Sequence, residues 1–518
     1  METILSSGGM NFFAFDVGNS SQDEVAVVAK WMSDFGYTSN GTYDNADGTV
    51  STATIIDVAR NSDVVYINGH GGEYANIQVR NSNGNITSYL CADASVNPGD
   101  TITKYGIGAR WKTGSTTKTT SYWNNGTKWV ILAPCSQLNY NGVGQGTHWN
   151  GLTSAEVWAR TMLGDGQRIH GYVGYYNTAP GGSTHTSRLE NFFGYCMHNN
   201  SQIVDAWAQA HTFLIGSSDW AAIYHSANMD DRFQSMSATT ANGSAYEIYY
   251  VGRNISEHEI DIASASDFAT TEGIMEGQDC LPQFNNIATK NFSAEATRSA
   301  LKNKLKLSDN SIFEVENNGR ITYSVGERNW GDHNLNYELT DSEAILAAEQ
   351  ELDKLGLLPQ DSYRTVVSRI ERIKLDLSGE QENVQETVEY TVSFYRTHNG
   401  IDVLSDQEDG IIVGFNKDGL TELRYMWRNL SVVASDALGT SKKITFQQAQ
   451  EACQTALVRG EQIKTTRDAE GISKSFFVTT AYLQIDNAVK PVWAFSTDNS
   501  YANCIFVDMY TGNVLNVV

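Results

Sequence analysis

The first half of the chain alternates short, continuous apolar runs with segments of helical periodicity. The apolar runs predict strands at 10–17, 63–68, 128–134 and 169–176, and the periodic segments predict helices at 23–37, 53–59, 154–163, 187–198 and 203–215. Apolar strands separated by helices are typical of a parallel sheet that is covered on both faces. The expected fold class of this half is therefore α/β, with a mostly parallel sheet and helices on both faces.

Two segments interrupt this alternation. Residues 89–129 are rich in Gly, Thr and Ser and contain few apolar residues, which indicates a mobile surface insertion. Residues 255–290 are acidic and weakly periodic, which indicates a connector. The expected division is an α/β domain over 1–250, a connector over 251–293, an α+β domain over 294–435 and a second α+β domain over 436–518.

The C-terminal half has a different pattern, in which alternating strand segments outnumber helices. Helices are expected at 294–305, 342–355 and 445–458, and strands at 363–375, 386–397, 410–416 and 420–429. The last 40 residues add short alternating segments that follow the helix at 445–458. This order predicts one helix packed against a small antiparallel sheet at the end of the chain.

Composition and charge narrow the function classes. Of 518 residues, 41% are apolar, and 36 basic residues face 60 acidic ones, giving a formal net charge of −24. A phosphate backbone would repel such a chain, so nucleic acid is not an expected partner. No apolar run approaches the roughly 20 residues that span a bilayer. The Lys-poor, Tyr-rich composition favours a secreted or cell-surface protein, although no signal peptide is visible at the N-terminus.

Two residues at the ends of predicted strands carry candidate chemistry. His70 follows the strand at 63–68 and is flanked by glycines, and Cys135 follows the strand at 128–134. In an open parallel sheet, residues at the carboxyl ends of neighbouring strands converge on one crevice. A Cys–His pair there could attack a carbonyl carbon and protonate the leaving amine, with the N–H groups of Gly71 and Cys135 binding the oxyanion.

Each residue also has a simpler interpretation. A cysteine after an apolar strand is often a small buried hydrophobe, and Gly-His-Gly is often a turn. Asn68 and Glu73 could orient His70 or could satisfy the turn backbone, and we prefer the second interpretation. The remaining cysteines are interpreted as structural, without CxxC pairs, and the remaining histidines lack metal-ligand spacing, so neither a metal nor another cofactor is expected. These residues are Cys91, Cys196, Cys453, Cys504, His185, His198, His211 and His225.

The blocks VVYINGHG and WVILAPC, in this order, resemble those of the caspase–gingipain–clostripain–legumain group of cysteine peptidases, also called clan CD. The likeness extends over about residues 10–215, and the motif W-x-x-L-x-P-C-S-Q-L resembles a bacterial branch of that group. The resemblance implies a caspase-like fold, with Cys135 as nucleophile and His70 as acid–base. Pro134 departs from the pattern, because relatives usually have Ala, Asp or Ser there, and this leaves the substrate preference open.

The same resemblance suggests which residues contact the substrate. Caspase-like enzymes place a specificity residue at the end of the first strand, where this sequence has Asp16. Tyr175, Tyr176 and Asn177, at the end of a later strand, would form the opposite wall. A carboxylate in that pocket pairs well with Arg or Lys, so cleavage after basic residues is expected, with self-cleavage at Lys112 or Lys118. The alternative is that Asp16 caps the following turn.

The end of the chain resembles the PepSY-like domains that accompany secreted bacterial peptidases. The resemblance rests on the helix at 445–458, on Pro491-Val492-Trp493, and on Val507-Asp508 followed by Thr511–Val514. It implies that the C-terminal domain regulates the first domain, with a spacer or adhesion role as the alternative. The leading hypothesis for the whole chain is a secreted cysteine endopeptidase acting on peptide or protein substrates. A non-catalytic binding or adhesion module and a hydrolase or transferase of non-peptide amides are the alternatives.

Overall fold

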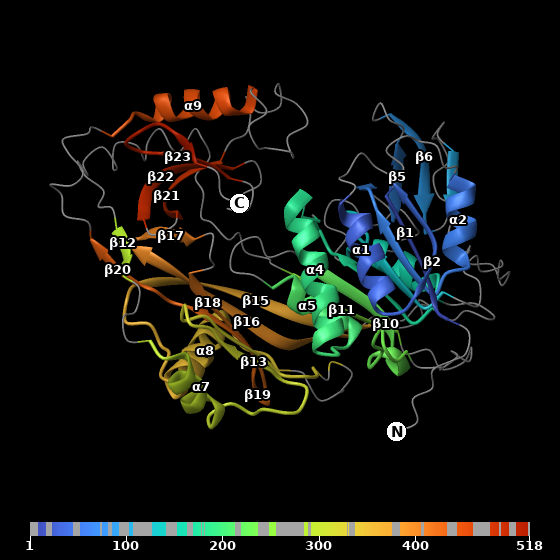
Figure 1. The fold of residues 1–518 in the computed structure, drawn as a ribbon, viewed down its shortest axis with the longest axis horizontal. Helices are drawn as coiled ribbons and strands as arrows, with labels where there is room; N and C mark the ends of the chain where they lie inside the picture. Colours follow the sequence, from blue (N-terminus) through green and yellow to red (C-terminus); the bar gives the residue numbers. More distant parts are fainter. Residues whose placement is uncertain are drawn as a thin grey trace.

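The structure is a computed structural model, and the fold is described for the parts of the chain that it places. These are residues 9–16, 23–44, 52–72, 75–80, 85–92, 103–106, 127–140, 153–162, 169–177, 179–180, 182–212, 219–236, 248–254, 284–287, 292–328, 330, 337–375, 384–405, 409–432, 443–458, 477–485, 488–496 and 504–515. Within these ranges the protein is a mixed α/β structure with eight α-helices and a large sheet of parallel and antiparallel strands (Figure 1).

The N-terminal part of the large sheet has the strand order β2-β1-β3-β8-β9-β10-β11. The first five strands in this order pair in parallel, and β10 and β11 are antiparallel to their neighbours. The strands are β1 (Asn11–Asp16), β2 (Thr38–Asp44), β3 (Val64–Asn68), β8 (Trp129–Leu132), β9 (Gly171–Tyr175), β10 (Trp220–His225) and β11 (Ile248–Asn254). The apolar runs of β1, β3, β8 and β9 thus form strands within about three residues of the predicted bounds. β2, β10 and β11 were not predicted.

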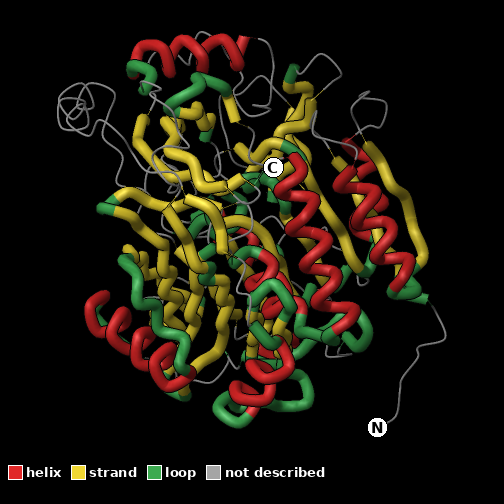
Figure 2. Tube along the Cα trace, turned by 60° about the vertical axis from the view of Figure 1, so that its left-hand side comes forward, coloured by secondary structure: helices red, strands yellow, loops and turns green. Residues whose placement is uncertain are grey.

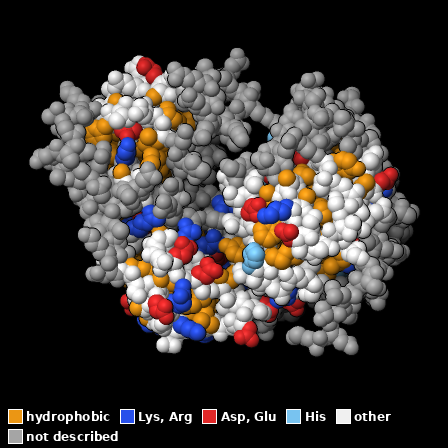
Figure 3. Space-filling view, in the orientation of Figure 1, with side chains coloured by type: hydrophobic (Ala, Val, Ile, Leu, Met, Phe, Trp, Pro, Cys, Tyr) orange, Lys and Arg blue, Asp and Glu red, His pale blue; other side chains and the backbone are white. Residues whose placement is uncertain are grey.

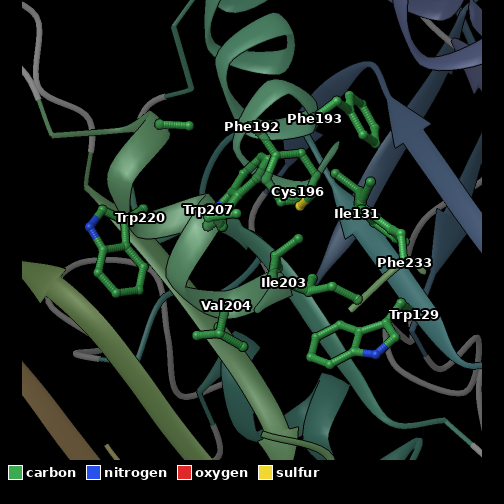
Figure 4. Close-up of a cluster of buried hydrophobic side chains, with 14 of the residues drawn as sticks. Trp129, Ile131, Phe192, Phe193, Cys196, Ile203, Val204, Trp207, Trp220 and Phe233 are labelled. Atoms are coloured by element: carbon green, nitrogen blue, oxygen red, sulfur yellow. The ribbon is translucent and has the colours of Figure 1, made fainter. Parts of the chain in front are cut away.

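Helices cover both faces of this sheet. Side chains on β1 alternate between the faces: Phe12 and Ala14 contribute to one core cluster, and Phe13 and Phe15 to the other. The first face packs against α1 (Asp23–Asp34), α4 (Gly182–His198) and α5 (Ile203–Ala210), and the second against α2 (Thr52–Arg60) and α3 (Ser154–Arg160). Figure 4 shows aromatic side chains of α4 and α5, including Phe192 and Trp207, in the first cluster.

A small second sheet lies between β3 and β8 in the sequence. It has the order β4-β5-β6-β7, formed by β4 (His70–Gly72), β5 (Asn76–Arg80), β6 (Ile86–Cys91) and β7 (Thr103–Gly106). Ile77, Val79 and Leu90 are buried in the same cluster as α3, and this burial accounts for strands in a segment of low hydrophobicity. The insertion expected at 89–129 therefore contains the end of β6 and all of β7, and it is not confined to the surface, because Leu90 is buried. Residues 107–126 of that insertion lie outside the described residues.

The large sheet continues into the C-terminal half without a break. β11 pairs antiparallel with β15, from Tyr249 opposite Lys374 to Asn254 opposite Arg369. From there the order is β15-β16-β18-β19-β14-β13, all antiparallel. These elements are β13 (Ile312–Val315), β14 (Ile321–Ser324), β15 (Tyr363–Lys374), β16 (Val384–His398), β18 (Gly410–Asn416) and β19 (Gly419–Met426), with α7 (Ala294–Lys302) and α8 (Asp341–Leu355). The two halves of the chain thus share backbone hydrogen bonds.

The last part of the chain forms a helix on a small sheet, as the pattern predicted, and this sheet is antiparallel except for one pairing, of residues 403–405 with 482–484, which is parallel. α9 (Phe446–Val458) covers the strands that lie between residues 477 and 508 (Figures 1 and 2). Its Ala449 and Cys453 are buried in one cluster with Trp493. One strand of this sheet, β12, lies within the predicted connector. The elements are β12 (Phe284–Ile287), β17 (Ile401–Ser405), β20 (Asn429–Val432), β21 (Phe477–Ile485), β22 (Ala488–Ser496), β23 (Ile505–Asp508) and β24 (Val514–Leu515).

Charges on the described surface are mixed in sign. On the face drawn in Figure 3, basic and acidic side chains lie among one another over the C-terminal half. Arg364 and Asp402, for example, form an ion pair with an N–O distance of 2.7 Å. None of the helices in the described part of the chain has the length and apolar character that a membrane-spanning helix needs.

Candidate active site

His70 and Cys135 follow neighbouring parallel strands, and the backbone of Gly71, next to His70, lies against that of Cys135. β3 pairs in register with β8, with Ile67 opposite Leu132, so both residues lie just beyond the same edge of the sheet. A Cβ atom on Gly71 would lie 1.9 Å from the carbonyl oxygen of Cys135. Only a residue without a side chain permits this approach. Both His70 and Cys135 are half-buried, so each keeps some exposed surface.

Unusual backbone conformations flank both residues. Gly69, between β3 and His70, has a φ of +146°, which is open to glycine and rarely to other residues. Ser136, directly after Cys135, has a φ of +59°, in the left-handed region that is uncommon for non-glycine residues. Its N–H donates to the carbonyl oxygen of Asn177 at 2.6 Å. Strained conformations of this kind concentrate at functional sites, because surrounding contacts must hold them.

The Cys135 thiol has a backbone N–H group directed at it. The N–H of Ala179 lies 3.3 Å from the Sγ atom. Burial raises the pKa of the Cys135 thiol above its ordinary value, while the N–H groups of Ala179 and of Cys135 itself act in the opposite direction. The resting side chain is therefore the neutral thiol at neutral pH, and reaction as a thiolate requires a base that removes the proton.

Gln137 braces the turn that carries the cysteine. Its fully buried side-chain amide donates to the carbonyl oxygens of Asn76, at 3.1 Å, and Cys135, at 3.2 Å, and its Oε1 accepts from Trp158 Nε1 at 3.3 Å. These bonds join the cysteine turn to β5 and α3. Sequence reasoning did not assign a role to Gln137, although it lies within the C-S-Q motif that carried the family resemblance.

Of the predicted wall residues, only Asn177 retains exposed surface. Tyr175 is fully buried, and its hydroxyl donates to Nε2 of His211 at 2.8 Å, while His211 Nδ1 donates to the Trp207 carbonyl oxygen. Burial lowers the pKa of His211 well below its ordinary value, so this imidazole is neutral. Tyr176 is also buried. The geometry brings 175–177 beside the cysteine turn, where the N–H of residue 138 donates to the Tyr175 carbonyl oxygen.

The side chain of Asn177 is held on two sides. Its amide nitrogen donates to Asp219 Oδ2 at 2.8 Å, and its oxygen accepts from Asn139 Nδ2 at 3.3 Å. Together with the bond from Ser136, these contacts fix Asn177 next to the cysteine turn.

Asp16 ends β1 directly opposite Asn68, the last residue of β3. It lies at the same sheet edge as His70 and Cys135, but its exposed fraction is 0%. Its charge and that of Glu24 contribute, after burial, to the raised pKa of the Tyr66 hydroxyl. Asp16 therefore belongs to a buried polar group beneath the sheet edge, and a substrate would reach it only after side chains over it move.

Glu24 is a buried carboxylate in this group that sequence reasoning missed. Asn68 Nδ2 donates to one of its oxygens, and His185 Nδ1 lies 3.2 Å from the other. Asn68 thus contacts α1 rather than only the turn that follows it. The sequence held no signal for this contact, because a glutamate near the start of a helix is ordinarily a solvated residue that favours the helix dipole.

Three of the other cysteines lie in the core, and three other candidate residues lie outside the described part of the chain. Cys91, Cys196 and Cys453 are buried. Glu73, Lys112 and Lys118 lie outside the described residues. Within the described ranges, no group of three or more His, Cys, Asp or Glu side chains is arranged to hold a metal ion.

Comparisons with protein-family models, with curated proteins and with solved structures find no match to this chain. The residues and their geometry alone therefore carry the assignment of function.

Proposed function

We propose that the protein is a cysteine endopeptidase, a hydrolase in which Cys135 is the nucleophile and His70 the acid–base. The observation that carries the proposal is the contact between the His70–Gly71 segment and Cys135 at the carboxyl ends of two adjacent parallel strands. Catalytic groups in open α/β sheets gather at this edge. The resemblance of both sequence blocks to clan CD peptidases, and the helices on both sheet faces, support a caspase-like arrangement.

The chemistry needs only the chain's own groups. His70 removes the thiol proton as Sγ attacks the carbonyl carbon of the scissile bond, and the N–H groups of Gly71 and Cys135 bind the resulting oxyanion. When the C–N bond breaks, His70 donates that proton to the leaving amine. Water then attacks the thioester with His70 as base, which releases the carboxylic acid and restores the thiol.

Cleavage after basic residues is the weaker part of the proposal. The position of Asp16 at the same sheet edge supports it, and the full burial of Asp16 argues against direct contact with a substrate. Screening a peptide library separates these alternatives. Preference for Arg or Lys that disappears in Asp16→Ala supports the role of Asp16, and preference for acidic or large apolar residues in both proteins contradicts it.

Secretion and regulation by the C-terminal, PepSY-like part are further elements of the proposal. Regulation is supported by β15, which extends the sheet that carries the candidate dyad. Since that pairing joins the two halves, a spacer role would be tested better by substitutions in the interface than by removing the C-terminal half.

One observation favours the alternative of a non-catalytic module on the same fold. The Cys135 thiol has a pKa that burial raises above its ordinary value, as expected of a structural cysteine. An enzyme with this thiol depends on His70 to generate the thiolate, and a binding module has no such requirement. Reactivity therefore distinguishes the two functions.

Alkylation with iodoacetamide provides the test. A dyad at Cys135 is expected to react much faster than the other five cysteines, and unfolding should remove the difference. Cys135→Ala should abolish amidase activity, with little change in thermal stability because the side chain is half-buried. If Cys135 reacts no faster than the other cysteines, or if Cys135→Ala retains full activity, the peptidase proposal is wrong.

A further inference from the structure

Glu24 links the two chain segments that lie on either side of the candidate dyad. It is in the first turn of α1 and only 2% exposed. One carboxylate oxygen accepts from Asn68, the last residue of β3, and the other faces Nδ1 of His185 in α4 at 3.2 Å. Asn68 precedes His70 by two residues, so the first contact fixes the strand end from which His70 projects.

The second contact fixes the segment on the other side of the thiol. His185 lies near the start of α4, and the chain just before this helix contains Ala179, whose N–H lies 3.3 Å from Cys135 Sγ. His185 also makes an edge contact with the ring of Tyr175, with centroids 5.7 Å apart. Through one carboxylate, the strand end that leads to His70 is therefore tied to the segment that contacts the cysteine.

The surroundings of Glu24 are costly for stability. Burying a carboxylate is unfavourable unless partners compensate for lost hydration, and replacing such groups by apolar ones is often neutral or stabilising. Two further buried atoms, His185 Nε2 and Tyr66 Oη, have no hydrogen-bond partner among the described residues. Orphan polar atoms of this kind are rare in folded proteins and need an explanation. Both belong to residues that interact with Glu24: His185 pairs with it, and its charge contributes, after burial, to the raised pKa of the Tyr66 hydroxyl.

We propose that Glu24 is a positioning residue for the Cys135–His70 pair. The inference rests on the proposed function and extends it to the residue that holds the pair in register. Glu24 acts through Asn68 and His185 and touches neither the thiol nor the substrate. Its loss lets the end of β3 and the start of α4 move independently, and a displacement of about 1 Å between reacting groups can reduce a rate about a hundredfold.

The fold contains a matched control at the opposite edge of the same sheet. Asp231 is a buried carboxylate that also joins two partners, His170 Nδ1 at 2.5 Å and Trp129 Nε1 at 2.9 Å. Trp129 is the first residue of β8, and His170 directly precedes β9. Cys135 lies beyond the other end of β8. Asp231→Ala thus also removes a buried carboxylate with two partners, but at a place remote from the candidate site.

The experiment measures the alkylation rate of Cys135 by iodoacetamide in the full chain between pH 5 and 9. Because a positioned imidazole promotes thiolate formation, the wild type should react at pH 6, and Glu24→Ala should be about 10- to 100-fold slower there. The pH dependence of alkylation in Glu24→Ala should also move to higher pH, because the buried thiol then ionises without a positioned base. Asp231→Ala should stay within about twofold of the wild type across this range, since its site is remote from the thiol.

Circular dichroism checks that each variant is folded. If Glu24→Ala does not fold, Glu24→Gln replaces it, and the alkylation rate of Cys135 should then fall at least about threefold. Rates within twofold of the wild type in a folded Glu24 variant overturn the inference. Equal slowing in the Glu24 and Asp231 variants also overturns it, because general loosening then explains both. A wild-type Cys135 that reacts no faster than the other cysteines refutes the proposed function instead.

Discussion

The contact between Gly71 and Cys135 makes a quantitative prediction, because a single methyl group should separate the two segments of the candidate site. Gly71→Ala would place the new Cβ 1.9 Å from the Cys135 carbonyl oxygen, 2.8 Å from its carbonyl carbon and 2.9 Å from its nitrogen. All three are backbone atoms, so no side-chain rotation relieves the clash. The His70–Gly71 segment or the cysteine turn must move.

The size of the movement follows from the distances. Ordinary van der Waals contact begins near 3.4 Å, so the two segments must separate by about 3.4 − 1.9 = 1.5 Å. Overpacking of this kind costs about 1–3 kcal/mol. For a cooperative unit of 150–250 residues, each kcal/mol lowers Tm by roughly 2–4 °C. The separation also exceeds the 1 Å that can cost about a hundredfold in rate.

Two assays measure these effects separately. Differential scanning calorimetry should show a Tm several degrees lower, and iodoacetamide should alkylate Cys135 about a hundredfold more slowly at pH 6. Gly194→Ala is the control: Gly194 lies within α4, with no described atom within 4 Å of the added Cβ, and alanine favours helices by about 1 kcal/mol. It should leave Tm unchanged or higher and the alkylation rate unchanged. A Gly71→Ala protein with wild-type Tm and alkylation rate would refute the contact itself.

Three further predictions concern other parts of the molecule. Gln137→Met removes the amide that donates to the carbonyl oxygens of Asn76 and Cys135. Chemical denaturation should therefore show a free energy of unfolding that is lower by about 1–3 kcal/mol. An unchanged denaturation midpoint would contradict the bracing role of Gln137. Burial raises the pKa of Asp205 to about 7, although the neighbouring Arg328 acts to lower it. The native state therefore binds this proton more tightly than the unfolded chain does, and the free energy of unfolding falls as the pH rises from about 4 to 7. Asp205→Asn should therefore be more stable than the wild type at pH 8 and similar at pH 4; equal stabilities at pH 8 argue against a buried Asp205. A chain ending at Glu257 exposes the paired edge of β11 and should aggregate or unfold at lower temperature than the full chain, whereas full stability would show that β15 contributes little.

Local sequence determined much of the first half of the fold. β1, β3, β8 and β9 are buried along nearly their whole length, so each is a continuous apolar run that can be recognised without knowing its neighbours. The proximity of His70 and Cys135 could also be predicted, because parallel strands with helical connections place their carboxyl ends at one edge. For Gly71 the sequence suggested only an N–H that binds an oxyanion, and its close approach to the Cys135 carbonyl oxygen was not predicted.

The tertiary structure alone decided how the two halves join and what lies beneath the dyad. β11 pairs with β15 through backbone hydrogen bonds, which every residue except proline can form, so no side-chain pattern marked the continuous sheet. Glu24 and His185 are far apart in sequence, and on their own helices they resemble ordinary polar positions. Their burial against Asn68 arises only when α1 and α4 pack side by side on the same face, because burial is a property of the assembled layers and not of the local sequence.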